Sequence, residues 1–274
     1  MPQTGSVVTT EWLLQLCPRV AMLGILYHLS QYIRLPLAHQ SVPRLIDLRR
    51  RIIACRRCPR LVAHREQIAR DKTRRFQDWA YWGRPVPGLG KADARLLVLG
   101  LAPAAHGANR TGRMFTGDRS GDWLIAALHA AGFANQASTV QCGDGLQLMD
   151  CYISAALRCA PPANKPSREE LASCQGYLLE ELRLLRRVRV LVALGRIAVT
   201  SYWSARMALD LAVPRPRPRY AHGQRHELGD VTLLISYHPS QQNTFTGRLT
   251  RAMLQAVFDT ARAILDERGN SDPQ

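Results

Sequence analysis

Four short apolar runs, separated by helical patterns, constrain the fold of this chain more than any other feature of its sequence. The runs are rich in Val, Leu and Ile and lack the polar alternation of a half-exposed strand. Strands buried on both faces have this composition, and parallel strands need crossover helices between them. The sequence therefore predicts an α/β fold with a central, largely parallel four-stranded sheet flanked by helices. The four runs cover residues 94–100, 149–157, 188–194 and 231–237.

Two helical patterns lie between these runs. Residues 122–133, "DWLIAALHAAGF", place apolar side chains at helical spacing and end near Gly132. Residues 167–187 begin with Ser167 and, three positions later, Glu170, which is the signature of a capping box. A helix after each of two strands supports the crossover topology.

The chain divides at residues 43 and 268. We expect residues 1–43 to form a partly helical N-terminal extension, 44–268 to form the α/β domain, and 269–274 to be a short tail. The most apolar stretch, residues 19–33, contains Arg, His, Ser and Gln and is shorter than the roughly 20 apolar residues that a membrane span needs. No basic region precedes it, as one would in a signal peptide, so we expect no membrane association.

The chain is strongly basic. It has 37 Lys and Arg against 21 Asp and Glu, a formal net charge of +16. Residues 44–75 hold twelve of the basic residues and only three acids. Such a positive field attracts phosphate backbones, although a basic surface can also exist without that role. Charge therefore makes nucleic acid a candidate partner without establishing it.

Cysteine spacing points to a metal site. Cys55 and Cys58 form a CxxC pair, and Cys159 and Cys174 flank a Pro-rich loop. With no export signal, thiols rather than disulfides are expected, and four thiolates can complete the coordination of one metal centre. Spacing alone does not separate zinc from iron–sulfur, and redox motifs share CxxC. The other three cysteines compete for the last two places, although we expect two of them, Cys17 and Cys151, to be buried apolar residues; the third is Cys142.

Three polar segments follow the predicted strands, at residues 100–118, 158–167 and 238–250. In open parallel sheets, ligands bind beyond the carboxyl ends of the strands. We therefore expect these three loops to converge on one pocket. The first loop is rich in glycine but has neither the GxGxxG order nor the GxxxxGK[ST] pattern, which argues against a nucleotide-binding enzyme.

The first and last of these loops resemble motifs of the uracil-DNA glycosylase superfamily. They read "GLAPAAHGANRTGRMFTGD" and "HPSQQNTFTGRLT", and the resemblance extends from Cys55 to about residue 265. The chain is most similar to family 5, the B-type enzymes. This resemblance implies the three-layer glycosylase fold. It also implies a [4Fe–4S] cluster, because Cys55, Cys58, Cys159 and Cys174 match the cluster positions of families 4 and 5.

The resemblance also implies catalytic residues. His238 matches the histidine that hydrogen-bonds the leaving base. Asp118 is a candidate for the carboxylate that orients water or supports the sugar cation. A structural alternative is that Asp118 or Ser120 caps the helix that follows. Asn109 is a further polar candidate in the first loop.

Substrate contacts are implied for the same loops. Phe115 matches the aromatic residue that stacks on the extruded base, and Asn164 is a candidate to contact base or water, although turn asparagines often satisfy backbone. Arg248 and the Arg-rich CxxC region are expected to meet phosphates, while residues 240–248 press into the duplex. The complete set of expected substrate-binding residues is Phe115, Ala102, Ala104, Asn164, Asn243 and Arg248.

Two departures from relatives predict a permissive pocket. The GxxP turn has Leu101 and Ala102 at its middle positions, where classical uracil-DNA glycosylases have an acidic residue. Ala155 stands where family 4 enzymes have an asparagine that reads the uracil edge. Without these polar groups, we expect several deaminated or damaged bases to be accepted.

The resemblance therefore implies a monofunctional DNA glycosylase of base excision repair that flips its target base out of the duplex. We expect a monomer acting on DNA, cytoplasmic and associated with a bacterial nucleoid. The alternative is a non-catalytic nucleic-acid-binding module that holds a metal cluster. Cleavage of uracil-containing oligonucleotides separates the two hypotheses.

Overall fold

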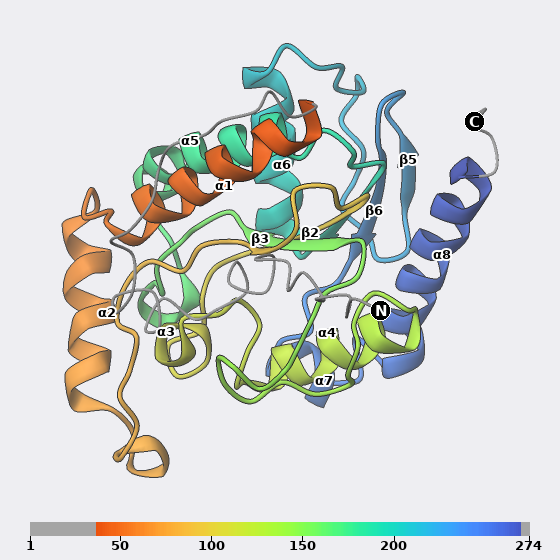
Figure 1. Cartoon of the computed structure of the whole chain (residues 1–274). Coiled ribbons are helices and arrows are strands. Elements are labelled where there is room, and N and C mark those ends of the chain that lie inside the picture. The colour runs from red at the N-terminus through yellow and green to blue at the C-terminus, as the bar shows by residue number, and fades with distance from the viewer. Residues whose placement is uncertain (1–36, 270–274) are drawn as a thin grey trace, which may run out of the picture.

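The computed structural model describes residues 37–269, which form an α/β fold around a six-stranded sheet of order β1-β3-β2-β4-β6-β5 (Figure 1). The four central strands are mutually parallel and fall inside the four apolar runs. All of their residues are buried, as expected for strands covered on both faces. The predicted fold class is confirmed. These strands are β2 (Leu96–Gly100), β3 (Cys151–Ala155), β4 (Val190–Leu194) and β6 (Thr232–Ser236).

Two short edge strands extend the predicted four-stranded sheet to six. β1 (Leu89–Gly90) pairs antiparallel with β3, and β5 (Arg225–Glu227) pairs antiparallel with β6. They are two and three residues long, and the Arg-His-Glu sequence of β5 has no apolar pattern. Short, charged strands are typical of protected sheet edges. They carry too little periodicity to be predicted from sequence.

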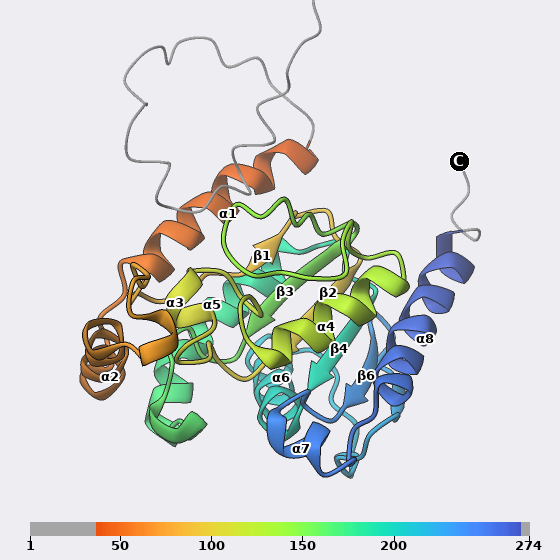
Figure 2. The same cartoon turned by 90° about the horizontal axis from the view of Figure 1, so that it is seen from below.

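Helices cover both faces of the sheet, which gives the expected three layers (Figures 1 and 2). On one face lie α1 (Leu37–Ile53), α5 (Arg168–Leu184) and α6 (Arg196–Ala208). On the other face lie α4 (Arg119–Ala130) and α8 (Arg251–Gly269). Each face has its own apolar core. The sheet lies between the two cores, so its strands are packed on both faces.

Shorter elements surround this framework. In Figure 2, α2 (Pro59–Asp71) lies at one end of the molecule and α7 (Gln241–Phe245) below the sheet. α3 (Ala108–Thr111) belongs to the glycine-rich loop that follows β2. Two 3₁₀ turns, η2 (Arg74–Phe76) and η3 (Pro162–Asn164), complete the loops. These elements shape the edge at which the parallel strands end.

The predicted N-terminal boundary at residue 43 falls inside α1. Leu45, Leu48 and Ile52 of this helix are buried in the core shared with α5 and α6. The helix therefore belongs to the domain, while the rest of the expected extension and tail, residues 1–36 and 270–274, lies outside the described residues. Between residues 37 and 269, no helix combines the length and apolarity required to cross a bilayer.

Candidate functional site

The carboxyl ends of the parallel strands bring the predicted site residues to one edge of the sheet. Gly100 ends β2 and pairs directly with Ala155, the last residue of β3. Gly195 follows β4, and His238 lies two residues beyond the end of β6. This is where ligands bind in open parallel sheets. Two of the three predicted loops, 100–118 and 238–250, therefore meet here.

Phe115 and His238 face one another across this edge. Their ring centroids are 6.1 Å apart and their planes differ by 31°. Gly100 makes this position possible, because a Cβ atom there would lie 2.8 Å from the Phe115 ring. Phe115 also has a left-handed backbone, with φ of 49°, which is uncommon for an aromatic residue. Such strain is retained where the surroundings fix a functional side chain.

His238 is held in a neutral state. Burial lowers the pKa of its imidazole to about 4. The Asn243 side chain supports the His238 backbone by donating its Nδ2 hydrogen to the His238 carbonyl oxygen at 2.9 Å. A Cβ at Gly195 would approach the His238 Cβ within 3.2 Å, so the glycine leaves room for the histidine. At neutral pH this imidazole can donate one hydrogen bond without carrying a charge.

Asp118 is the N-cap of α4. Its Oδ1 accepts a hydrogen bond from the Gly121 backbone N–H at 2.9 Å, so the capping alternative is observed at Asp118 rather than Ser120. Burial raises the pKa of the Asp118 carboxyl, while the backbone hydrogen bond from Gly121 opposes that rise. The Ser120 backbone N–H also hydrogen-bonds this carboxyl and likewise opposes the rise. A catalytic role for Asp118 is compatible with capping and stays a prediction.

The alanines of the predicted site lie in different surroundings. Ala102 packs against the core formed by α1, α5 and α6, whereas Phe115 belongs to the core on the opposite face. The carbonyl oxygen of Ala104 accepts backbone hydrogen bonds from Gly107 and Asn109, which fixes the turn before α3. Ala155 is 1% exposed and lies beside Gly100, at the level of the Phe115 ring.

The remaining polar candidates do not make a recorded contact with Phe115 or His238. Asn109 is buried and donates its Nδ2 hydrogen to the Arg65 carbonyl oxygen, which links α3 to α2. Asn164 is exposed, with a left-handed backbone in η3. The Arg248 guanidinium lies 4.5 Å from the centre of the Tyr237 ring. Their predicted roles in binding or catalysis remain predictions.

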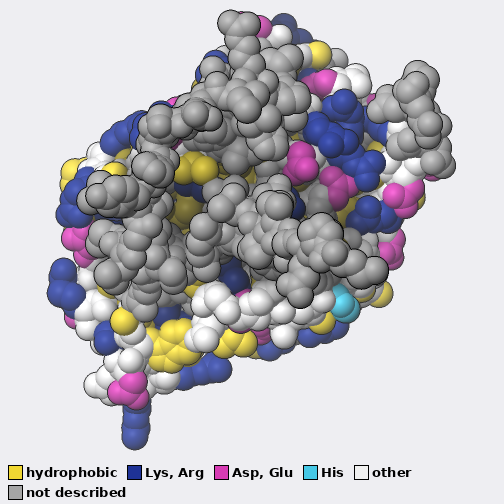
Figure 3. All heavy atoms as spheres, viewed as in Figure 1, with side chains coloured by type: hydrophobic (Ala, Val, Ile, Leu, Met, Phe, Trp, Pro, Cys, Tyr) yellow, Lys and Arg dark blue, Asp and Glu magenta, His cyan; other side chains and the backbone are white. Residues whose placement is uncertain are grey.

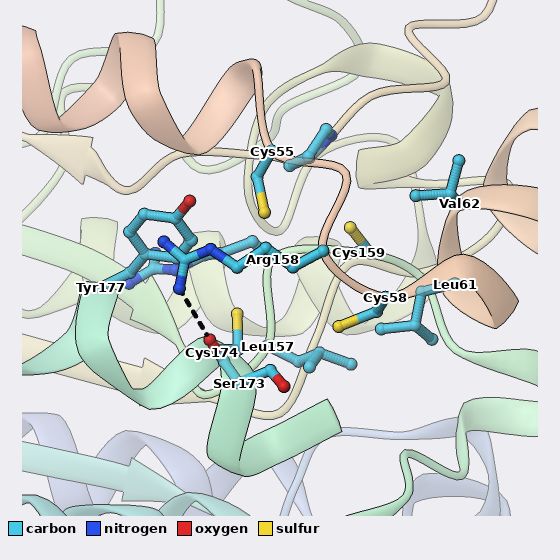
Figure 4. A pocket seen from close by; sticks show the side chains of 12 residues that line it. Cys55, Cys58, Leu61, Val62, Leu157, Arg158, Cys159, Ser173, Cys174 and Tyr177 are labelled. Carbon is cyan, nitrogen blue, oxygen red and sulfur yellow. Dashed lines mark hydrogen bonds between the residues drawn. The ribbon is translucent and has the colours of Figure 1, made fainter. Parts of the chain in front are cut away.

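The four predicted ligand cysteines line one cavity. Cys55 follows α1, Cys58 precedes α2, Cys159 follows β3, and Cys174 lies on the second turn of α5. Figure 4 shows their sulfur atoms turned toward a common space. Within residues 37–269, no three His, Cys, Asp or Glu side chains are close enough to hold a single metal ion. The four thiols therefore line the same cavity without converging on a single point.

The chemistry of these thiols suits a cationic or electron-deficient group. Burial raises the pKa of Cys159 to about 12 and of Cys174 to about 11, and the neighbouring thiols add to both shifts. Burial and Cys55 also raise the pKa of Cys58. Thiols with such pKa values stay protonated at neutral pH unless a metal replaces the proton.

Two buried arginines adjoin this cavity. Arg158 lines it and pairs with Glu181 at 2.5 Å, yet its Nε and Nη1 groups are buried without a hydrogen-bond partner among the described residues. Arg65 lowers the pKa of Cys159, and its own Nε is likewise buried and unsatisfied in this part of the chain. Buried N–H donors normally have partners. Four thiolates around a cluster would supply negative charge beside both arginines, so the residues present fit such a group.

The other cysteines have different environments. Cys151 is 1% exposed in β3, which confirms the prediction that it is a buried apolar residue. Cys142 is half-buried and does not line the cavity. Cys17 lies outside the described residues.

Ion pairs occupy much of the Arg-rich segment at residues 44–75. Glu180 and Glu170 of α5 pair with Arg51 and Arg60, and Glu66 pairs with Arg56. On the face seen in Figure 3, dark blue Lys and Arg side chains are interspersed with magenta Asp and Glu. Phosphate contact by this segment stays a prediction, but several of its arginines already have intramolecular partners.

Sequence reasoning missed three residues that shape the site. Gly195 and Arg158 were not identified because their contacts join segments far apart in the chain. Arg110 lies inside the glycine-rich motif, and its burial between two aromatic rings is a property of the folded chain. No local pattern distinguishes any of the three.

The fold and the site define an α/β protein with a ligand site over the ends of its parallel strands and a four-thiol cavity. The model of the "Uracil DNA glycosylase superfamily" matches residues 87–262. The chain is 52% identical to the "Type-5 uracil-DNA glycosylase" of Mycobacterium tuberculosis over 222 residues, which cover 80% of this chain and 81% of the relative. The chain belongs to the uracil-DNA glycosylase superfamily.

Other relatives support the same placement. Identity to the "Type-5 uracil-DNA glycosylase" of Thermus thermophilus is 48% over 214 residues, 78% of this chain and 94% of the relative. Identity to a "Type-4 uracil-DNA glycosylase" of Pyrobaculum aerophilum is 31% over 176 residues, 58% of this chain and 74% of the relative. Similarity is therefore higher to these type-5 proteins than to this type-4 protein.

Proposed function

We propose that this chain is a monofunctional DNA glycosylase of base excision repair, which hydrolyses the N-glycosidic bond of uracil and other deaminated or damaged bases. The observation that carries the proposal is the pairing of Phe115 with a neutral His238 at the carboxyl edge of the sheet. An extruded base needs an aromatic face on which to stack and a polar group at its edge. These two side chains supply both.

His238 acts on the departing base. As the glycosidic bond breaks, negative charge develops on the base and positive charge on the sugar. A neutral imidazole that donates a hydrogen bond to the base stabilises the first of these charges in a partly desolvated site. Because burial holds the His238 pKa near 4, the imidazole carries no charge that would repel the sugar cation. Asn243 keeps the histidine in place through its carbonyl oxygen.

Asp118 acts on the sugar side. Its Oδ1 accepts a hydrogen bond from the Gly121 N–H, and in this proposal the same carboxylate orients the attacking water. A carboxylate also stabilises the developing positive charge on the sugar. Both tasks need the ionised form, although burial raises the pKa of this carboxyl.

The four-thiol cavity would hold a [4Fe–4S] cluster through Cys55, Cys58, Cys159 and Cys174. Cys₄ ligation is the usual way that proteins bind such clusters. When bound, the cluster supplies a structural crosslink between the α1–α2 connection, the loop after β3 and α5.

DNA would be held along the outer edge of the same loops. Phe245 of α7 is 66% exposed, and Arg119 of α4 lies over its ring at 4.3 Å. An exposed apolar side chain on a loop beside a base pocket can enter the duplex where a nucleotide has been extruded. Arg248, three residues further along, would meet a phosphate of that strand.

Ala155 accounts for the proposed breadth of substrate. It lies beside Gly100 at the pocket edge and presents no group that can read a base edge. A site built to hydrogen-bond one base rejects other bases strongly, because they leave its polar groups unpaired. A site without such a polar group loses that rejection. Discrimination then depends on shape, stacking and the ease of extrusion.

Single-turnover excision tests the proposal. Uracil, hypoxanthine and ethenocytosine are placed in identical duplexes, with the unmodified duplex as control. We expect excision of uracil and at least one of the other two. Activity on uracil alone would contradict the breadth, and DNA binding without any excision would favour the non-catalytic module.

A further inference from the structure

Arg110 differs from every other buried arginine in the described chain. The buried arginines of residues 37–269 are Arg65, Arg110, Arg113, Arg158 and Arg206. Four of these five lie within 4.0 Å of a carboxylate, at distances of 3.7, 2.6, 2.5 and 2.9 Å. Within the described residues, Arg110 has no carboxylate at that range. Burying an unpaired charge is costly, so this position calls for a physical reason.

The Arg110 guanidinium lies in the corner formed by the rings of Phe76 and Trp79, called the aromatic clamp below; the ring centres are 5.9 Å apart and the ring planes differ by 75°. Its central carbon lies 3.9 Å from the centre of the Phe76 ring and 4.0 Å from that of the Trp79 ring. Both rings come from residues 72–88, which connect α2 to β1. Cation–π contacts of this kind offset part of the desolvation cost. They also fix the plane of the guanidinium.

The same guanidinium bridges the two ends of the glycine-rich loop. Its Nε donates to the His106 carbonyl oxygen at 2.8 Å, and its Nη2 donates to the Gly117 carbonyl oxygen at 2.9 Å. Gly117 directly precedes Asp118. The loop segment between these two carbonyls contains Phe115. One side chain therefore ties together the part of the loop that presents both the stacking ring and the carboxylate.

The charge of Arg110 also acts on Asp118. Arg110 lowers the pKa of the Asp118 carboxyl and so opposes the rise that burial causes. Burial lowers the pKa of Arg110, and Asp118 opposes that fall. The other ionisable group that acts on Asp118 is Asp122 on α4, which raises its pKa further. Arg110 is therefore the cationic side chain among the described residues that counters burial and Asp122.

We propose that Arg110 is a positioning residue, which closes the 106–117 loop from the aromatic clamp of Phe76 and Trp79 and supplies the positive charge facing Asp118. This inference rests on the proposed function only in the role given to Asp118. Because Arg110 makes no direct ion pair with Asp118 among the described residues, it does not occupy the carboxylate that water would meet. A cation in contact with the sugar would oppose the developing positive charge, so Arg110 acts through the loop and the carboxylate.

Titration of the Asp118 carboxyl in the DNA-free protein tests this without any use of activity. The carboxyl signal is followed by ¹³C NMR of aspartate-labelled protein and assigned with Asp118→Asn. In Arg110→Gln, which loses the charge and keeps an N–H donor, we expect the Asp118 pKa to rise above the wild-type value. In Arg110→Lys, which keeps the charge, we expect it to stay close to the wild-type value. An unchanged pKa in Arg110→Gln would overturn the electrostatic part of the proposal.

Single-turnover excision then tests the bridging part. Arg110→Lys cannot reproduce the planar fork that spans two carbonyls. We expect its rate to fall at least tenfold with the acid limb of the pH profile unchanged, while the acid limb of Arg110→Gln moves to higher pH. A wild-type rate in Arg110→Lys would overturn the proposal even if Arg110→Gln does not fold. Failure of the wild type to excise any base would instead contradict the proposed function, leaving the carboxyl titration intact as evidence.

Discussion

The cysteine cavity and the strand-end site of Phe115, Asp118 and His238 differ in how their buried ionisable groups are paired. Around the cavity, the buried Arg158 has a buried carboxylate partner in Glu181, which also accepts hydrogen bonds from Tyr152 and Ser154. At the strand-end site, His238 is neutral, and Asp118 has backbone donors but no cation within 4.0 Å among residues 37–269. Paired charges stabilise a fixed geometry. Unpaired, desolvated groups stay available to a substrate, and perturbed pKa values of this kind cluster at functional sites.

The largest effect is expected from removing a cavity thiol. Cys159→Ser should abolish cluster binding, because a hydroxyl is a poor replacement for a thiolate ligand, and should lower Tm because metal binding contributes folding free energy. Iron content should fall from about four per chain, as Cys₄ ligation of a [4Fe–4S] cluster implies. Iron analysis and thermal unfolding measure both effects. Cys142→Ser, outside the cavity, should change neither; stoichiometric zinc in the wild type would contradict the cluster.

Breaking the buried pair beside the cavity comes next. Glu181→Gln leaves Arg158 without its carboxylate and should lower the free energy of unfolding by about 3–5 kcal/mol. The matched control is Glu180→Gln, the next residue on α5, whose ion pair with Arg51 is exposed. That change should cost less than about 1 kcal/mol. Denaturant unfolding of the iron-loaded protein measures the difference, and equal losses would show that burial does not separate the two pairs.

Removing the His238 imidazole is expected to lower the excision rate. His238→Ala should lower single-turnover excision of uracil by about 10²–10³-fold, the range for removing one donor to a developing anion. DNA affinity should change little, since the interaction strengthens in the transition state. His226→Ala, on the edge strand β5, is the matched control. Equal losses in affinity and rate would make His238 a docking residue.

The smallest effect is a pH dependence of stability. In the unfolded chain His238 titrates near 6.5, and burial lowers its folded pKa to about 4. Between these values the unfolded chain holds a proton that the folded chain does not, so stability falls as pH drops from 6.5 toward 4. His238→Gln should flatten this slope. Urea unfolding at pH 7 and pH 5 measures it; an unchanged slope would mean that His238 is not desolvated.

The features that were predictable from sequence are those set by local pattern. The apolar runs identified all four parallel strands because each is buried on both faces, and Ser167 with Glu170 forms the predicted capping box. The cysteines also gathered as expected. Edge strand β5 was not predictable, because its pairing with β6 is decided by a sheet already formed.

Conformation within the motif loops was beyond sequence for a similar reason. Phe115, with its positive φ, needs the space that Gly100 leaves for its ring. The surroundings of Arg110 are made by Phe76 and Trp79, which lie about thirty residues earlier in the chain. The catalytic role of Asn109 stays a prediction, but the hydrogen bond from its Nδ2 to the Arg65 carbonyl oxygen of α2 could not be read from the motif. Which side of a short helix faces a pocket is a tertiary property.

The ion pairs between the Arg-rich segment and α5 have a consequence for the thermodynamics of DNA binding. Each phosphate that a protein cation neutralises releases condensed counterions and contributes about 0.9 to the slope of log K against log salt concentration. Arg51, Arg56 and Arg60 are already neutralised by glutamates and would release few. The measured slope should therefore correspond to far fewer phosphates than the 37 Lys and Arg of the chain suggest. Exchanging Glu180 and Glu170 for glutamine would free two of these arginines and steepen it.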